Sequence, residues 1–131
     1  MIAGIGADLA DVTRFETLLE RFGARAVEKI LAPVEMAPFY RAARPAAYLA
    51  KRWAAKEAFA KALGTGIAKG VTLPQIAVVK GSNGEPLLEL SGVAAELLSR
   101  RGINRCHLTL SDERLASGVM IANAFVVLEI T

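Results

Sequence analysis

The segment 45–66 constrains the fold of this chain most, because it predicts one long helix. It opens with a proline, which suits the first turn of a helix, and closes with Gly64 and Gly66, which favour a helix end. The wider stretch 41–69 carries seven Lys and Arg residues and a single acid, Glu57. A cation-rich helix with one carboxylate is suited to phosphate groups and a divalent metal.

Two cations of this helix occupy unusual positions. At about 100° per residue, the bulky apolar residues form one arc, and Arg52 and Lys56 lie inside it. The apolar residues of the arc are Tyr48, Leu49, Trp53, Phe59 and Leu63. Such cations can lay their stems along apolar surface and keep their heads in water. We favour a functional role instead, because two of them break the usual separation of charge from the apolar stripe. Glu57 and Lys61 project together beside this arc, and an ordinary surface ion pair is the alternative there.

Length and charge limit the classes of protein to which this chain can belong. A chain of 131 residues is expected to form one domain over 1–131, and it is short for an enzyme with a cleft of its own, so another subunit could complete a site. The net charge of +3 hides an asymmetry, since residues 14–69 hold 11 Lys and Arg against 5 Asp and Glu. The first half is therefore expected to face an anion. Aromatic residues make up only 6%, which gives little support for nucleic-acid binding.

Several classes of site and location are disfavoured. Cys106 is the only cysteine, which excludes an internal disulfide, and we expect it to be a small buried hydrophobe. His107 is the only histidine, so a histidine metal cluster is excluded. The N-terminus lacks the pattern of a signal peptide. The longest uncharged run, 115–128, has 14 residues, fewer than the roughly 20 that a spanning helix needs. We expect a cytoplasmic protein without a membrane partner.

Hydrophobic periodicity changes from helical to alternating along the chain. The expected helices are 12–22 with a Thr13–Glu16 capping box, 26–31, one after Pro33, 45–63, and one from a Ser91 cap to Gly102. The expected strands are 1–9, 76–80, 86–90, 106–110 and a stretch within 119–130, with an Asn-Gly hairpin between the second and third and a turn at 111–114 before the last. These elements predict an α+β domain with helices mostly in the first half, packed on a mainly antiparallel sheet.

Asp8 follows the first apolar strand, and it can cap the next helix or act as a ligand at the sheet end. Taken alone, the cap is the better interpretation. Asp8 and Glu57 together suggest Mg²⁺, which takes one or two carboxylates and fills its other positions with water and phosphate oxygens. Gly4 and Gly6 begin a dinucleotide-like pattern, but the third glycine is missing, so we reject a Rossmann fold.

Two spaced motifs resemble one known family. The start Gly-Ile-Gly-Ala-Asp-Leu at 4–9, together with Trp-Ala-Ala-Lys-Glu-Ala at 53–58 and Lys-Ala-Leu-Gly-Thr-Gly at 61–66, resembles the bacterial holo-[acyl-carrier-protein] synthases, which are 4′-phosphopantetheinyl transferases. The resemblance covers essentially the whole chain, and only the stretch after Leu115 is longer than expected. It implies a 4′-phosphopantetheinyl transferase fold and a homotrimer with sites at the subunit interfaces.

The resemblance also implies a reaction and its residues. The phosphopantetheine arm of coenzyme A would move to a serine hydroxyl of apo acyl carrier protein, Mg²⁺ would assist, and adenosine 3′,5′-bisphosphate would leave, a step of fatty acid biosynthesis. Asp8 and Glu57 match the metal ligands. Positions near coenzyme A match Arg52, Lys56, Lys61, Gly64, Thr65, Gly66, His107 and Thr109. Arg14, Arg21 and Arg25 match the surface that meets the acidic carrier protein.

Catalytic roles follow as hypotheses. Phosphoryl-type displacement needs positioning and charge neutralisation, which the cations supply. The serine needs a base, and we assign this role to Glu57, directly or through a metal-bound water. Lys61 is the expected catalytic cation. His107 has a second interpretation as a core or edge histidine, and the three arginines have one as a solvated helix face. The alternative function is a non-enzymatic basic module that binds RNA or an acidic protein, which leaves Asp8 and Glu57 without a role.

Overall fold

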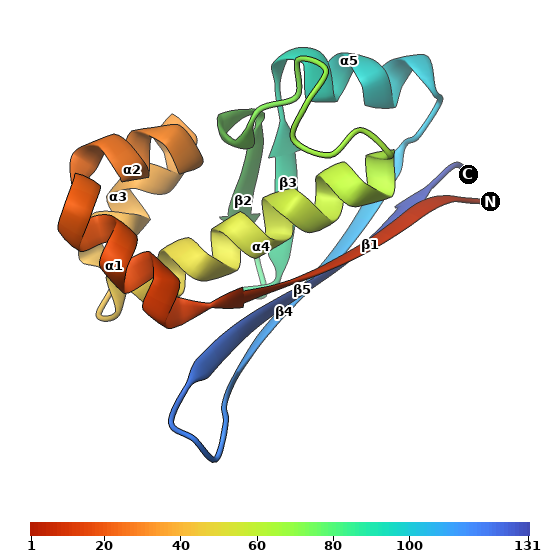
Figure 1. Ribbon diagram of the computed structural model, residues 1–131. Helices are drawn as coiled ribbons and strands as arrows, with labels where there is room; N and C mark the ends of the chain where they lie inside the picture. The colour runs from red at the N-terminus through yellow and green to blue at the C-terminus, as the bar shows by residue number, and fades with distance from the viewer.

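A three-stranded antiparallel sheet with a long helix across one face forms the centre of the computed structural model, which describes residues 1–131 (Figure 1). The strands lie in the order β1 (Ile2–Asp11), β5 (Met120–Glu129) and β4 (Arg105–Arg114). The helix is α4 (Pro45–Leu63), which packs against β1 and β5. The last strand of the chain, β5, therefore pairs with the first, β1, and the two termini lie side by side.

The remaining elements surround α4. Three short helices lie at one end of α4, and a two-stranded antiparallel hairpin with a further helix lies on its other side (Figure 1). These elements are α1 (Val12–Phe22), α2 (Ala24–Ile30), α3 (Pro33–Arg41), the 3₁₀ helix η1 (Leu73–Gln75), β2 (Ile76–Lys80), β3 (Pro86–Leu90) and α5 (Gly92–Arg100). No helix is both long and apolar enough to cross a membrane.

Glycine allows β1 to approach α4 closely. A Cβ atom on Gly4 would lie 2.0 Å from the backbone oxygen of Ala62, and one on Gly6 would lie 2.0 Å from that of Ala58. Only glycine avoids these clashes with a backbone that cannot move aside. The facing positions on α4 are alanines, which keep the helix surface flat. This close approach brings Asp8, two residues after Gly6, against the side of α4.

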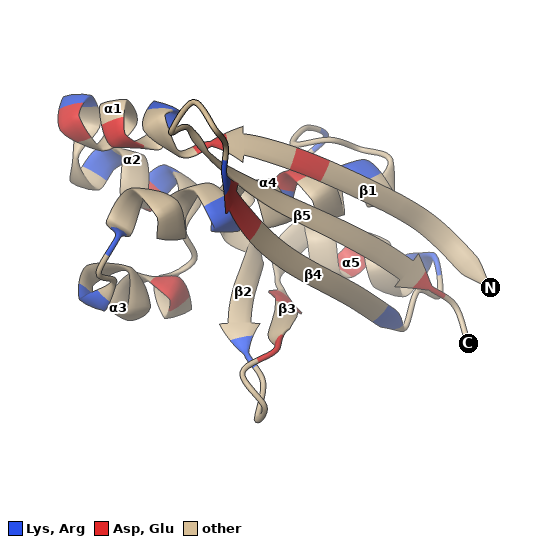
Figure 2. Ribbon diagram, turned by 90° about the horizontal axis from the view of Figure 1, so that it is seen from below, with Lys and Arg blue, Asp and Glu red and all other residues tan.

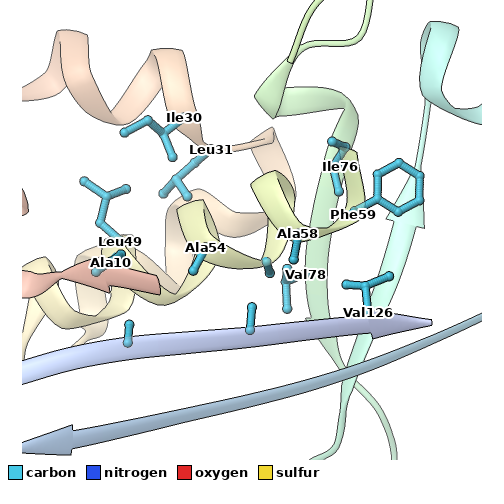
Figure 3. Close-up of a cluster of buried hydrophobic side chains, with 14 of the residues drawn as sticks. Ala10, Ile30, Leu31, Leu49, Ala54, Ala58, Phe59, Ile76, Val78 and Val126 are labelled. Atoms are coloured by element: carbon cyan, nitrogen blue, oxygen red, sulfur yellow. The ribbon is translucent and has the colours of Figure 1, made fainter. Parts of the chain in front are cut away.

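The core wraps around α4 rather than lying under a single stripe. Ala54 and Ala58 are fully buried towards the sheet, while Leu49 and Phe59 are fully buried towards the other elements (Figure 3). The far side of this core comes from α2 and β2, through residues such as Ile30, Leu31, Ile76 and Val78 (Figure 3). Any charged side chain on the buried part of α4 must therefore find a partner inside the protein.

The structure confirms most elements that the sequence predicts. Helices 12–22 and 45–63 and strands 76–80 and 86–90 have the expected bounds. Gly64 ends α4 in the left-handed conformation, with φ of 87°. The α+β class, with helices mostly in the first half, is also confirmed.

Other expectations about the strands are wrong. The expected turn at 111–114 is part of β4, and the true turn covers 115–119, where the backbone N–H of Leu115 donates to Val119 O at 2.8 Å. Polar residues at 111–114 continue the strand because each pairs with a residue of β5. In place of one sheet there are two, since β3 pairs only with β2.

Local caps also differ from expectation. Asp11, and neither Asp8 nor a Thr13–Glu16 capping box, begins α1, because its Oδ1 accepts a hydrogen bond from Thr13 N at 2.9 Å. Asp8 remains inside β1, three residues before the cap residue Asp11. Ser91 occupies the cap position of α5 but its side chain makes no cap bond. Gln75 Oε1 accepts from Ala94 N there instead, at 3.1 Å.

Candidate active site

Asp8, Glu57 and Lys61 come together where β1 crosses α4. Lys61 Nζ donates to Asp8 Oδ1 at 2.7 Å and to the backbone oxygen of Ala7 at 3.2 Å. The Asp8 side chain is 11% exposed and that of Lys61 is 52% exposed. Figure 2 shows the acidic band midway along β1 next to charged bands of α4. The site is thus a partly buried carboxylate pair with a cation at its mouth.

Burial and the neighbouring Asp8 both favour the protonated form of Glu57. Burial raises the pKa of the Glu57 carboxyl above its ordinary value, and the negative charge of Asp8 raises it further. Lys61 and Arg14 oppose this shift of the pKa. The Glu57 side chain makes no hydrogen bond or ion pair, so both of its oxygens are available to a ligand. Its raised proton affinity is the property that a general base near neutral pH requires.

The donor set fits a magnesium ion. Oδ2 of Asp8 is buried and has no hydrogen-bond partner. An orphaned buried carboxylate oxygen is costly unless a cation or water satisfies it. No group of three or more His, Cys, Asp or Glu side chains is present that could cage a metal by itself. Two carboxylates with room for oxygen ligands from water and substrate match Mg²⁺ rather than a fully protein-bound metal.

Arg14 lies beside this site, which sequence reasoning did not predict. Its guanidinium stacks 4.8 Å from the centroid of the Trp53 ring, and Trp53 is one helical turn before Glu57. The interaction holds the arginine at the edge of the site while leaving it exposed. Arg21 lies over the Phe22 ring at 5.3 Å, and Arg25 lines a hollow of about 300 Å³ between α1 and α2. The three arginines share one end of the molecule.

The loop after α4 lies one turn beyond Lys61. The backbone N–H groups of Gly64, Thr65 and Gly66 all donate to Ala60 O. Arg101 of the α5 end donates to Leu63 O and so ties the loop to the rest of the protein. The expected nucleotide loop therefore begins within one turn of Lys61 and is held by the end of the same helix.

Arg52 is not part of the carboxylate cluster. Its guanidinium lies 3.9 Å from the centroid of the Tyr48 ring and lines a hollow of about 610 Å³ formed by α3, α4 and β2. β1 contributes nothing to this hollow. Arg41, Lys51 and Lys80 line it as well, so it is strongly cationic. Within one chain, Arg52 and Asp8 therefore lie on different surfaces.

His107 and Thr109 also lie apart from the cluster. Both are exposed on β4, on the sheet face that turns away from α4. His107 Nε2 lies 2.9 Å from Glu129 Oε1, and this contact lowers the pKa of Glu129. Within one chain they face away from α4, whereas Asp8 lies against it.

The structure places Lys56, which was expected near the phosphates of coenzyme A, inside the core. It is fully buried, and its ammonium group donates to Glu35 Oε1 at 2.6 Å. Burial lowers the pKa of Lys56 while Glu35 raises it. The cost of a buried cation explains why the helix places it against a buried acid. Sequence reasoning missed Glu35, because nothing in the order of residues shows that an acid 21 positions earlier would reach the core.

Comparison with known proteins agrees with this arrangement. The family model of the 4′-phosphopantetheinyl transferase superfamily matches residues 4–116. Holo-[acyl-carrier-protein] synthase of Laribacter hongkongensis is 54% identical over 114 residues, which are 87% of this chain and 91% of that protein.

Two solved structures share the fold. Holo-[acyl-carrier-protein] synthase of Neisseria meningitidis is 40% identical with a TM-score of 0.89, over 98% of this chain and 99% of that one. The enzyme of Helicobacter pylori, solved in complex with coenzyme A, is 30% identical with a TM-score of 0.76, over 95% of this chain and 99% of that one. The chain therefore belongs to the 4′-phosphopantetheinyl transferase superfamily, and within it to the holo-[acyl-carrier-protein] synthases.

Proposed function

We propose that this enzyme moves the 4′-phosphopantetheine group of coenzyme A to a serine hydroxyl of apo acyl carrier protein, with Mg²⁺, for fatty acid biosynthesis. Adenosine 3′,5′-bisphosphate is the other product. The cluster of Asp8, Glu57 and Lys61 carries the proposal, because it combines an unsatisfied carboxylate oxygen, a carboxyl with raised pKa and a half-exposed cation. The coenzyme A complex of the Helicobacter pylori relative supports the donor.

The residues of the cluster divide the work. Asp8, through Oδ2, and Glu57 would hold Mg²⁺. When bound, this ion supplies charge neutralisation and orientation of the pyrophosphate. Glu57 takes the proton of the serine hydroxyl, whose oxygen attacks the phosphorus as the bond to the bisphosphate oxygen breaks. Lys61 is half exposed and can turn from Asp8 to the negative charge that grows on the leaving group.

The metal and the nucleotide product can be tested together. Wild-type protein is incubated with coenzyme A and apo carrier protein, in Mg²⁺ or in excess chelator, and the nucleotides are separated by chromatography. We expect adenosine 3′,5′-bisphosphate to appear in step with coenzyme A loss, and only with Mg²⁺. Equal product in chelator would contradict the metal assignment. The basic-module alternative is not supported, because the family consists of enzymes.

Carrier docking is proposed for the surface around Arg14, Arg21 and Arg25. Acidic groups on the carrier would meet these arginines, and the nearby hollow offers apolar contact through Leu18 and Phe22. Replacing all three arginines with Glu should raise KM for the carrier protein by about tenfold or more, because attraction becomes repulsion. KM for coenzyme A should change little. Steady-state kinetics with each substrate varied in turn measures both values.

A matched control for this prediction is Arg100→Glu. Arg100 belongs to α5, which lies at the other end of the molecule from α1 (Figure 1). It should leave both KM values unchanged. Equal loss of carrier and coenzyme A binding in the triple variant would indicate misfolding and not a docking role.

A homotrimer is proposed for the exposed face of the large sheet. No helix covers this face in one chain (Figure 1). As a result, Ile5, Leu9 and Phe125 on this face are 61%, 66% and 41% exposed. Neighbouring copies would bury these side chains and bring His107 and Thr109 near the site of another subunit. Light scattering should give three times the chain mass of 13.9 kDa.

Phe125→Asp tests the interface, because it places a charge in the apolar patch. We expect this variant to be monomeric, folded by circular dichroism, and slower by about 10²-fold, since the shared site is lost. Val79→Asp, on a strand outside this sheet, controls for the added charge and should remain trimeric. A wild-type monomer with full activity would refute the shared site.

A further inference from the structure

We propose that Lys56 is a positioning residue of the transfer reaction: its buried ion pair with Glu35 fixes the rotation of α4, so that Glu57 faces Asp8. This inference rests on the proposed function, since it concerns how the carboxylate pair is assembled. It gives Lys56 a different role from Lys61, the lysine five residues later, which lies at the mouth of the site.

All three donors of the Lys56 ammonium are satisfied inside the protein. Besides Glu35 Oε1 at 2.6 Å, they reach Ile76 O at 2.6 Å and Leu73 O at 3.1 Å. The side chain has no exposed surface. A lysine with three internal acceptors and no path to solvent has no free donor for a phosphate oxygen.

Glu35 is equally committed. Its Oε1 also accepts from Ala32 N at 2.9 Å, and its Oε2 accepts from Val78 N at 2.9 Å. The pair thus joins α4 to three other segments: the start of α3, the 3₁₀ helix η1 and β2. Each bond has a defined direction, so the group fixes an angle as well as a distance.

The angle matters because Glu57 is the next residue of the helix. Side chains of consecutive helical residues point about 100° apart, so anchoring Lys56 in the core sets the direction of Glu57. On the β1 side the closest packing is glycine against alanine, through Gly6 and Ala58, and the hydrogen bonds to β1 come from the half-exposed side chain of Lys61. The glycine–alanine packing itself contains no directional bond between side chains. The ion pair supplies the directional restraint that this packing lacks.

Energetics also favour orientation over stability as the role of the pair. Two apolar side chains of similar size often stabilise a core as well as a buried ion pair does, because the charges must lose their hydration. Breaking the pair by removing one partner is costly, since the other charge stays buried. The consequences of single and paired replacement therefore differ, which makes the role testable.

The test is a set of variants measured for thermal unfolding and for kcat and KM with coenzyme A. Lys56→Met leaves the Glu35 carboxylate unpaired, so we expect the melting temperature to fall by roughly 10 °C and kcat by about tenfold. Adding Glu35→Gln removes the unpaired charge and keeps an acceptor for Val78 N. The double variant should regain most of the melting temperature but not of kcat, because residue 56 then makes no directional bond that fixes α4. Its KM for coenzyme A should stay within about twofold of wild type.

Lys61→Met is the matched control, because it removes an exposed lysine from the same helix. It should lower activity with a smaller fall in the melting temperature, because the buried Glu35 carboxylate stays paired with Lys56. Two results for a folded double variant at Lys56 and Glu35 would overturn the proposal: kcat close to that of the wild type, or KM for coenzyme A raised about tenfold. In the second case Lys56 would act on the donor.

A second measurement uses the wild-type protein, so it holds even where Lys56→Met fails to fold. Reductive methylation, mapped by peptide mass spectrometry, should leave Lys56 unmodified with or without coenzyme A. Lys61 should react, and coenzyme A should protect it. Methylation of Lys56 that coenzyme A blocks would refute a positioning role. Unfolding and methylation need no turnover, so they remain informative if the proposed reaction itself fails.

Discussion

Glu57→Gln should reduce phosphopantetheine transfer by at least about 10²-fold while making the metal-free protein more stable to heat at neutral pH. Activity is lost because the amide neither accepts the serine proton nor binds a cation as a carboxylate does. Stability rises because the pKa of Glu57 is raised in the folded protein, first by burial and then by Asp8. The native state therefore favours the protonated form, and the ionised form costs stability.

The pH dependence gives the sign of this effect. Above the folded pKa, Glu57 is ionised in both states and its cost to the native state is complete. As pH falls through the folded pKa towards the ordinary value of 4.5, the native carboxyl takes up its proton first and the cost disappears. The stabilising effect of Glu57→Gln should shrink over this window. Thermal unfolding of both proteins from neutral to acid pH measures it.

Asp8→Asn serves as a comparison because Asp8 is paired. It should also lose transfer, but without the gain in stability, since it gives up the ion pair with Lys61. Activity close to wild type in either variant would contradict the assignment of the carboxylates. A Glu57→Gln protein less stable than wild type at neutral pH would contradict the electrostatic account of the site.

Gly6→Ala should be the most damaging conservative substitution in the chain. The new Cβ would lie 2.0 Å from Ala58 O, so strand and helix must separate. Overpacking of this kind should cost about 3 kcal/mol and lower the melting temperature by roughly 10 °C. Asp8 follows two residues later, so its distance from Glu57 should also change, and a shift of about 1 Å can cost 10²-fold in rate.

The control is Ala3→Ser on the same strand. Ala3 is exposed and lies at the irregularity between Ile2 and Gly4, opposite no residue of β5. This variant should keep stability and activity near wild type. Circular dichroism melts and transfer assays on both proteins separate the effects. A Gly6→Ala protein with unchanged melting temperature would show that β1 and α4 do not depend on this close approach.

Local signals in the sequence were sufficient for most elements. Proline at the first position of α4 and glycine after its last residue set its two ends, and the Asn-Gly pair set the hairpin between β2 and β3. The turn at 111–114 was wrong because polarity suggested a loop, whereas β5 offers each of these residues a partner in the ladder. Strand length depends on the partner strand, which local composition does not describe.

Part of the site could also be predicted from local signals in the sequence. Asp8, Glu57 and Lys61 were predicted together, and they meet because Gly4 and Gly6 let β1 lie against α4. The arc of apolar residues on α4 correctly marked Arg52 and Lys56 as unusual, but it led to one role for both. The structure gives Arg52 a cationic hollow and Lys56 a buried acid.

The difference between these two cations lies in long-range contacts. Glu35 is 21 residues from Lys56, and the acceptors Leu73 O and Ile76 O belong to backbone groups that no side-chain pattern reveals. Likewise, Arg14 of α1 stacks on Trp53 of α4, far along the chain. Local periodicity predicts which face of a helix is buried, but the partners that satisfy a buried charge depend on how the whole chain packs.

The central claim is that Asp8 and Glu57 support transfer of phosphopantetheine to a carrier-protein serine. Intact-mass spectrometry of apo acyl carrier protein, after incubation with the enzyme, coenzyme A and Mg²⁺, tests it most directly. We predict that the carrier becomes heavier by one phosphopantetheine with the wild-type enzyme, and remains unchanged with Glu57→Gln or when Mg²⁺ is chelated. An unchanged carrier mass with folded wild-type enzyme, or full modification by Glu57→Gln, would contradict the account.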